Sequence, residues 1–219
     1  MKYKAIIFDL DGTLINSLED IADAMNTVLT NNNYPIHNYE SYTYFIGNGL
    51  RKLVSRALPE QNRNQNEIDR CYEAMMIVYG ENCIRKTKPY NGIQALLDEL
   101  SSRNIPLTVL SNKSDVLTKK ITQTIFPEYF EAVVGLTTEE FKKPNPSTAL
   151  QISKQLNFAP SEIIFVGDSD IDIQTATQAG MFAVGATWGY RTKEELLLDG
   201  AQFLLDHPAD LLELFNTFS

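Results

Sequence analysis

Three short apolar segments of this sequence each end in polar residues. Residues 3–8 lead into Asp9, residues 106–110 lead into Ser111, and residues 162–166 lead into Gly167 and Asp168. Fully apolar strands are typical of a parallel sheet covered on both faces, and such sheets carry their sites beyond the carboxyl ends of the strands. The sequence therefore predicts a parallel sheet with its functional residues along one edge.

From Tyr90 onward, expected strands alternate with segments of helical periodicity. We expect helices at 92–103, 114–125, 147–156 and 171–179, further strands at 132–134 and 182–184, and two short segments near 202–204 and 209–215. Alternation of this kind is typical of α/β folds. We therefore expect a Rossmann-like α/β core formed by residues 1–14 and 86–219.

Residues 15–85 contain no convincing strand. Apolar residues recur at helical spacing within 18–29, 50–58 and 68–79. Ser17 with Asp20 resembles a capping box at the start of the first helix. Because one strand precedes this block and the others follow it, we expect 15–85 to be an all-helical insert in the α/β core.

The composition narrows the class of protein. The 219 residues include 19 Lys and Arg against 28 Asp and Glu, a formal net charge of −9. Phosphates repel such a chain, so we expect no nucleic-acid or membrane partner. Neither a signal peptide nor an apolar run of roughly 18 residues is evident. Two cysteines, Cys71 and Cys83, are too few for a disulfide framework, which favours a cytoplasmic protein. We expect a monomer or a homodimer.

The acidic residues at the strand ends indicate phosphate chemistry with a hard cation. Asp9 and Asp11 follow the first strand, and Asp168 and Asp172 follow a later one. Clustered carboxylates repel one another unless a cation lies among them, and Mg²⁺ binds carboxylates together with substrate phosphate. A carboxylate can also attack phosphorus and form an aspartyl-phosphate.

The hydroxyl of Ser111 and a lysine from the pair at 142 and 143 would add donors suited to phosphate oxygens. The residue pattern alone leaves open which lysine takes that part.

Four segments resemble the signatures of the haloacid dehalogenase-like phosphohydrolases, in the family's order and spacing. They are Phe8-Asp9-Leu10-Asp11-Gly12-Thr13-Leu14, Ser111-Asn112, Lys143, and Gly167-Asp168-Ser169 with Asp172. The resemblance spans nearly the whole chain and implies an α/β catalytic core with a helical cap, here residues 15–85. It also implies a phosphatase that depends on Mg²⁺.

The resemblance implies a role for each matching residue. Asp9 would be the nucleophile, and Asp11 would protonate the leaving oxygen and then activate water. An acid at position 11 favours phosphate esters, because dehalogenases need no such proton donor. The phosphate would be bound by Ser111, Asn112, Gly12 and Lys143, and Lys143 would also neutralise Asp9. Mg²⁺ would be bound by Asp9, Asp168 and the Asp11 main-chain carbonyl, with Asp172 supporting the metal or orienting Lys143.

The expected cap contains a segment that bears on the substrate. Gly47-Asn48-Gly49 precedes a helix whose first turn carries Arg51, which could meet a carboxylate or second anionic group. Residues 46–58 and 187–191 are similar to segments of the family's phosphoglycolate phosphatases. We therefore expect a small phosphorylated metabolite, 2-phosphoglycolate first. Alternatives are a pyrophosphatase, a sugar-phosphate or nucleotide phosphatase, a β-phosphoglucomutase-like enzyme, and a non-catalytic binding protein of the same fold.

Overall fold

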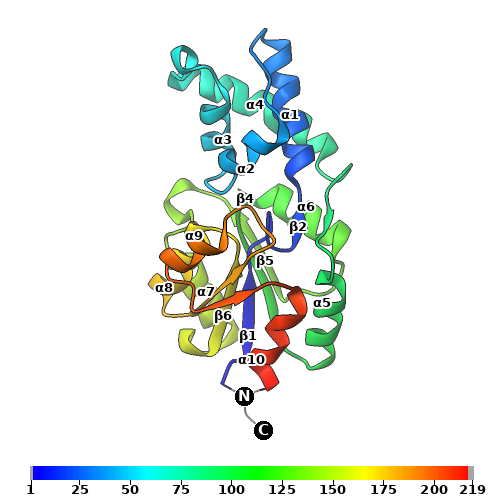
Figure 1. Ribbon diagram of the computed structural model, residues 1–219, viewed down its shortest axis with the longest axis vertical. Helices are drawn as coiled ribbons and strands as arrows, with labels where there is room; N and C mark the ends of the chain where they lie inside the picture. The colour runs from blue at the N-terminus through cyan, green and yellow to red at the C-terminus, as the bar shows by residue number, and fades with distance from the viewer. Residues whose placement is uncertain (1, 217–219) are drawn as a thin grey trace. The chain divides into compact units, whose positions relative to one another are not determined.

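A six-stranded parallel sheet is the framework of the larger of two compact units in the computed structural model, which describes residues 2–216 (Figure 1). The strand order is β5-β4-β1-β6-β7-β8. The strands are β1 (Ala5–Phe8), β4 (Leu107–Ser114), β5 (Ala132–Leu136), β6 (Ile163–Gly167), β7 (Phe182–Ala186) and β8 (Phe203–Leu205). The expected parallel α/β fold is confirmed.

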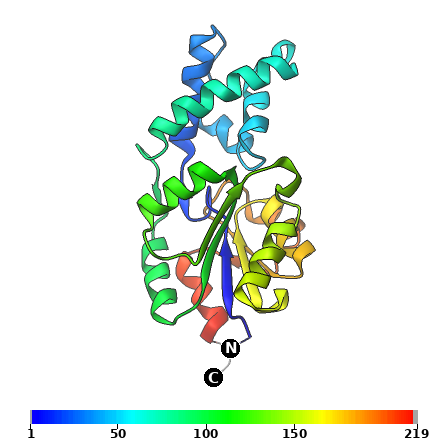
Figure 2. The ribbon, with the colours of Figure 1, turned by 180° about the vertical axis from the view of Figure 1, so that it is seen from behind.

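Helices cover both faces of this sheet. Those of the larger unit are α5 (Ile93–Ser102), α6 (Asp115–Ile125), α7 (Ser147–Leu156), α8 (Asp170–Ala179), α9 (Lys193–Leu198) and α10 (Glu213–Asn216), with 3₁₀ turns η2 (Glu139–Phe141), η3 (Pro160–Glu162) and η4 (Pro208–Leu212). Helices α5 and α6 lie on one face, and α7 and α8 lie on the other (Figures 1 and 2). Apolar side chains of α7, α8 and α9 pack on Ile7 and Phe165 of the sheet and form a buried core.

Strand β1 is a central strand of the sheet and has a neighbouring strand on each side. It pairs with β4 on one side, where Phe8 faces Val109, and with β6 on the other, where Phe8 faces Val166. All four of its side chains are buried, as expected for an apolar strand covered on both faces. Parallel sheets bind ligands at such a switch point, outside the carboxyl ends of the strands.

Strand β4 continues beyond its expected end at residue 110 and stops at Ser114. Ser114 pairs with Leu136, and the register shifts between Leu110 and Ser114. Ser111 and Asn112 therefore lie within the strand rather than after it. The sequence pattern missed this extension because the apolar run stops at Leu110, whereas the strand continues through the polar residues up to Ser114.

The smaller compact unit comprises residues 16–88. Its helices are α1 (Leu18–Asn31), α2 (Tyr39–Phe45), α3 (Leu50–Ala57) and α4 (Gln65–Asn82), with the 3₁₀ turn η1 (Glu60–Asn62). The expectation that 15–85 lacks a strand is wrong in one detail, since β2 (Ile15–Asn16) pairs with β3 (Lys88–Pro89). A two-residue strand carries too little pattern to be predicted.

The start of α1 also differs from expectation. Ser17 makes no side-chain capping hydrogen bond. The Asp20 carboxylate instead accepts hydrogen bonds from the backbone N–H groups of Lys86 and Thr87, at 3.0 and 2.8 Å, and from the Thr87 hydroxyl at 2.7 Å. Asp20 thus ties the first turn of α1 to the segment after α4.

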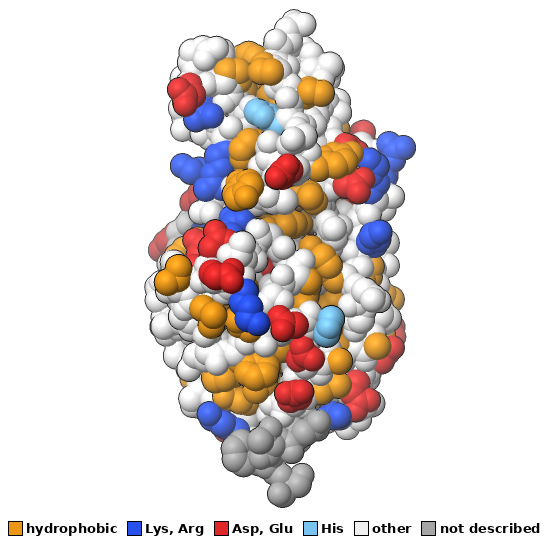
Figure 3. Space-filling model, viewed as in Figure 1, with side chains coloured by type: hydrophobic (Ala, Val, Ile, Leu, Met, Phe, Trp, Pro, Cys, Tyr) orange, Lys and Arg blue, Asp and Glu red, His pale blue; other side chains and the backbone are white. Residues whose placement is uncertain are grey.

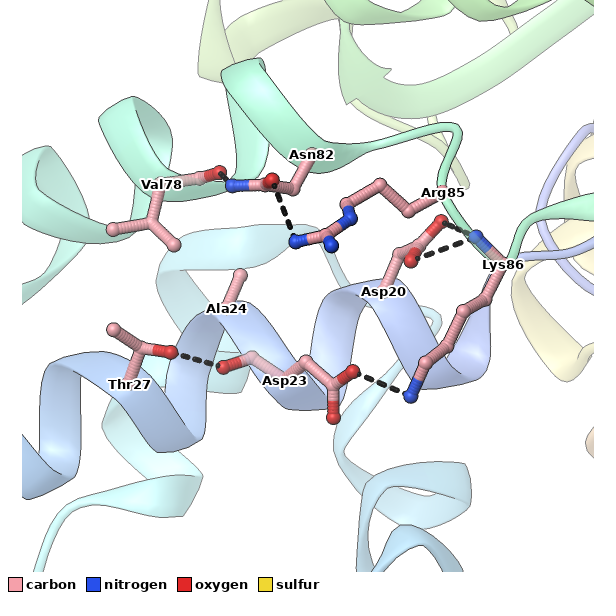
Figure 4. A pocket seen from close by; sticks show the side chains of 8 residues that line it. All are labelled: Asp20, Asp23, Ala24, Thr27, Val78, Asn82, Arg85 and Lys86. Carbon is pink, nitrogen blue, oxygen red and sulfur yellow. Dashed lines mark hydrogen bonds and ion pairs between the residues drawn. The ribbon is translucent and has the colours of Figure 1, made fainter.

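The same segment borders a pocket of about 450 Å³ within the helical unit (Figure 4). It is lined by Asp20, Asp23, Ala24, Thr27, Val78, Asn82, Arg85 and Lys86. Its charged groups are already engaged, since Lys86 binds Asp23 at 2.8 Å and Arg85 donates to Asn82 at 3.4 Å.

The surface carries both signs of charge. On the face seen in Figure 3, Lys and Arg side chains lie singly or in small groups among Asp and Glu. Among residues 2–216, no helix has the length and apolar character needed to span a membrane.

Candidate active site

The carboxyl end of β1 places Asp9 at the switch point of the sheet. The Asp9 backbone N–H donates to the Val166 carbonyl at 2.9 Å, which extends the pairing with β6 by one residue. The chain then turns tightly, because the Gly12 N–H donates to the Ile15 carbonyl at 2.9 Å. The expected nucleophile therefore lies directly after a buried strand, and the residues after it lie in a closed turn.

A buried ammonium bridges two of the expected carboxylates. Lys143 Nζ lies 2.6 Å from Asp9 Oδ1 and 2.6 Å from Asp172 Oδ1. Burial alone opposes the charge on Lys143, but Asp172 and Asp9 outweigh burial, so the pKa of Lys143 lies above its usual value. Burial raises the pKa of Asp9 to about 7, against the lowering effect of Lys143. The ion pairs thus join the end of β1 to the first turn of α8 through Lys143.

The sequence left two lysines open for this position, and the structure brings Lys143 to the carboxylates. Lys142 binds Glu139 at 3.0 Å on the surface. Asn112 aligns the Lys143 backbone from both sides: its Oδ1 accepts from the Lys143 N–H at 2.8 Å, and its Nδ2 donates to the Lys143 carbonyl at 3.1 Å. Asn112 therefore fixes the position of the Lys143 backbone.

Asp168 and Asp172 are held by the start of α8 and by the loop after β7. Asp172 Oδ2 accepts from the Ser169 N–H and hydroxyl, at 3.2 and 2.7 Å, as part of a capping box. Asp168 accepts from the Thr13 hydroxyl at 3.2 Å and from the Tyr190 N–H at 2.8 Å. Burial, and then Asp172 and Asp9, raise the pKa of Asp168 well above its usual value.

The backbone packs closely around Asp168. A Cβ atom on Gly12 would lie 2.3 Å from Asp168 Oδ2, and one on Gly189 would lie 2.2 Å from Asp168 Cβ. Trp188 donates its indole N–H to the Thr13 carbonyl at 3.0 Å. The segment 187–191, which the sequence singled out, thus supports the Asp168 carboxylate and the turn after β1.

The donor set suits a hard divalent cation. Asp9, Asp168 and Asp172 are buried, and each offers an oxygen within 4.8 Å of the others. Three carboxylates face the single ammonium of Lys143. Burial raises the pKa values of Asp9 and Asp168, and the neighbouring carboxylates add to that rise. Oxygen-only ligands are those Mg²⁺ prefers, and a cation here would favour the ionised carboxylates.

A second buried lysine, Lys113, was not anticipated from the sequence. Its ammonium contacts both oxygens of Asp11, at 2.7 and 2.6 Å, and its side chain is 1% exposed. The signal was present, because Lys113 directly follows Ser111-Asn112 in a buried stretch, and a buried lysine needs a charged partner. Ser111 Oγ accepts from the Lys113 N–H at 3.2 Å.

Arg51 lies in the first turn of α3, in the helical unit. Its guanidinium pairs with Asp69 of α4 and lies 4.3 Å from the centre of the Tyr72 ring. These contacts orient the side chain, which is 42% exposed. The two cysteines, Cys71 and Cys83, are buried thiols.

The comparison with known proteins agrees with this geometry. A model of the family described as haloacid dehalogenase-like hydrolase matches residues 6–186, which include the carboxylate cluster and both lysines. The chain is a haloacid dehalogenase-like hydrolase. The predicted family membership is thereby confirmed, and this hydrolase is an enzyme of that family.

Relatives of this hydrolase match it over nearly their full length. A phosphoglycolate phosphatase of Aquifex aeolicus is 35% identical over 214 residues, 97% of each chain. A phosphoglycolate phosphatase of Haemophilus influenzae is 30% identical over 220 residues, 97% of this chain and 98% of its own. The crystal structure of a protein from Haemophilus somnus, described as a predicted phosphoglycolate phosphatase, superposes with a TM-score of 0.91 at 29% identity, covering 98% of this chain and 99% of that one.

Proposed function

We propose that this hydrolase is a Mg²⁺-dependent phosphatase of small phosphorylated metabolites, with 2-phosphoglycolate as its preferred substrate. The observation that carries the proposal is the placement of Asp9 at the end of β1, paired with Lys143 and beside Asp168. The names of the relatives at 30–35% identity support the choice of substrate.

The reaction proceeds in two displacements. An oxygen of Asp9 attacks phosphorus while the bond to the leaving oxygen breaks, and Asp11 gives that oxygen its proton. Asp11 then accepts a proton from water, whose oxygen attacks the aspartyl-phosphate and releases phosphate and Asp9. The two acids take separate roles because only Asp9 lies in the cluster bound by Lys143.

The remaining residues bind the phosphate and the cation. Lys143 and the Ser111 hydroxyl donate to phosphate oxygens, and Gly12 lets the backbone approach closely. Asn112 keeps Lys143 in place. Mg²⁺, bound by Asp9, Asp168 and the Asp11 main-chain carbonyl with Asp172 in support, would neutralise charge on the phosphoryl group.

Substrate choice belongs in part to the helical unit. We propose that it acts as a cap, and that Arg51 meets a second anionic group of the substrate. A cap that excludes water strengthens every charge interaction inside the site. The packing of Arg51 against Asp69 and Tyr72 supports this role, because it pre-orients the guanidinium.

Phosphate release with Mg²⁺ tests the proposal. The panel contains 2-phosphoglycolate, pyrophosphate, hexose phosphates and nucleoside monophosphates, each measured as kcat/KM. We expect 2-phosphoglycolate to be preferred and Asp9→Asn to lower its turnover by about 10³-fold or more. Asp170→Asn is the matched control, since Asp170 lies outside the carboxylate cluster. An Arg51→Met variant in the same panel tests the cap contact.

Each contrary result removes a different part of the proposal. A preference for pyrophosphate or sugar phosphates would refute 2-phosphoglycolate and leave the phosphatase chemistry. Full activity in the Asp9→Asn variant would refute the aspartyl-phosphate. Absence of turnover with every ester would favour a binding protein of this fold.

A further inference from the structure

Two buried lysines bind different carboxylates of the site. Lys143 binds Asp9 and Asp172, on the side of the nucleophile. Lys113 lies at the end of β4, and its ammonium contacts both oxygens of Asp11. The Lys113 side chain is 1% exposed and that of Asp11 is 13% exposed. Asp11, the proposed general acid and base, is therefore paired with a lysine other than the one that binds Asp9.

This pairing competes with the proposed work of Asp11. The leaving oxygen of the substrate must contact an Asp11 oxygen, and Lys113 already donates to both of them. A carboxylate oxygen can accept more than one hydrogen bond, but the ammonium and the leaving group compete for the same acceptor sites. A substrate anion that takes over a contact of the ammonium frees an Asp11 oxygen and keeps the buried charge of Lys113 paired.

We propose that Lys113 is a specificity-determining residue that binds an anionic group on the leaving alcohol, the same group that Arg51 of the helical unit is proposed to meet. The inference rests on the proposed phosphatase function and deepens it. In 2-phosphoglycolate the carboxylate is attached to the carbon that bears the ester oxygen. An ammonium that contacts Asp11 is thus beside the place where that carboxylate arrives. Esters with a neutral leaving group leave Lys113 on Asp11.

The pair links recognition to chemistry. The substrate carboxylate draws the ammonium from Asp11, and Asp11 becomes available to the ester oxygen in the same event. The binding energy of the carboxylate, which does not react, in this way stabilises the transition state and does not only increase the affinity for the substrate. A site built around a charged group also discriminates strongly against analogues that lack it.

The test compares 2-phosphoglycolate with ethyl phosphate, which has the same two-carbon skeleton without the carboxylate. The measured quantity is the ratio of kcat/KM for the two esters, in the wild-type enzyme and in Lys113→Met and Lys113→Gln variants. We expect the ratio to fall by about 10- to 150-fold in both variants. The matched control is Lys119→Met, because Lys119 is 58% exposed and binds Asp115 on the surface of α6.

The glutamine variant keeps an amide donor for Asp11, so it removes the charge with less disturbance of the fold. A second measurement uses the unmodified enzyme: glycolate should inhibit hydrolysis of ethyl phosphate competitively, and the neutral amide of glycolate should not. Equal inhibition by the two compounds would overturn the assignment.

The remaining outcomes separate this inference from the proposed function. An equal loss on both esters would make Lys113 a positioning residue for Asp11 and overturn its part in specificity. An unchanged ratio would overturn the inference as well. No phosphate release from either ester by the wild-type enzyme would refute the proposed function, on which the inference rests.

Discussion

Gly12 occupies a backbone position that side chains rarely tolerate. Its φ is +97°, and an added Cβ would lie 2.3–2.7 Å from the Asp168 carboxyl group. We expect Gly12→Ala to destabilise the protein by about 1–3 kcal/mol. We also expect a higher Mg²⁺ concentration for half-maximal activity, because Asp168 must move. Thermal unfolding and a Mg²⁺ titration of phosphate release measure the two effects.

Gly80 provides the control for this substitution. It lies in α4, and a Cβ there would meet no atom within 4 Å. Gly80→Ala should leave the Mg²⁺ dependence unchanged and stabilise the helix slightly, because alanine restricts the unfolded chain. A Gly12→Ala protein with wild-type stability and Mg²⁺ dependence would contradict the close packing described around Asp168.

Residue types at this scale were more predictable than residue contacts. The pattern indicated the acids after β1 and β6, but it left Lys142 and Lys143 open and missed Lys113. The choice depends on where each ammonium points after folding: Lys142 turns to Glu139 and Lys143 to Asp9. Neighbouring residues in a loop have the same local chemistry, so only distant partners distinguish them.

At the scale of elements, Asp20 joins two segments of the helical unit. Its carboxylate receives the Lys86 and Thr87 N–H groups and the Thr87 hydroxyl, and it is 3% exposed (Figure 4 shows its pairing with Lys86). We expect Asp20→Ala to destabilise the protein by about 2–4 kcal/mol, because these donors lose their acceptor. Urea unfolding measures the change.

Two further variants sharpen this prediction. Asp20→Asn keeps one oxygen acceptor and should recover part of the lost stability. Asp23→Ala, one turn along α1, removes an exposed partner of Lys86 and should have a much smaller effect, since solvent screens that pair. If the alanine variants at 20 and 23 unfold at the same urea concentration, Asp20 does not join the segments.

Element positions followed closely from local pattern where the apolar periodicity was strong. Helix α7 was expected at 147–156 and forms at Ser147–Leu156. Helices α2 and α9 were not predicted, and among the strands the exceptions are β4, which runs on through polar residues, and the two-residue pair β2 and β3. In both exceptions the strand is defined by its pairing with a distant segment. A short polar stretch that pairs in this way shows no alternation of apolar and polar residues from which a strand could be predicted.

For the whole molecule, the acidic cluster predicts a dependence of stability on pH. The pKa of Asp9 rises from 3.8 to about 7 on folding, and that of Asp168 also rises. Between these pH values the folded chain holds a proton that the unfolded chain has released. The free energy of unfolding without Mg²⁺ therefore falls as pH increases from about 4 to about 7, by a few kcal/mol.

Thermal unfolding with EDTA and with Mg²⁺, at pH 5 and pH 7.5, measures this dependence. Mg²⁺ should raise the melting temperature more at pH 7.5, because it binds the ionised carboxylates. Working above pH 5 separates the effect from Asp23, Asp115 and Glu162, whose pKa values lie below their usual range. If Mg²⁺ raised the melting temperature equally at both pH values, the result would contradict the raised pKa values of Asp9 and Asp168.

The α/β class, the positions of most strands along the chain and the acids at their ends were accessible from the sequence alone, because burial on both faces and helical periodicity are local patterns. The contacts that make the site were decided by the tertiary structure. Lys143 and Asp9 are 134 positions apart, and Lys113 and Asp11 are 102 apart. Such pairs form because strand order brings distant segments to one sheet edge, where each buried charge takes the partner within reach.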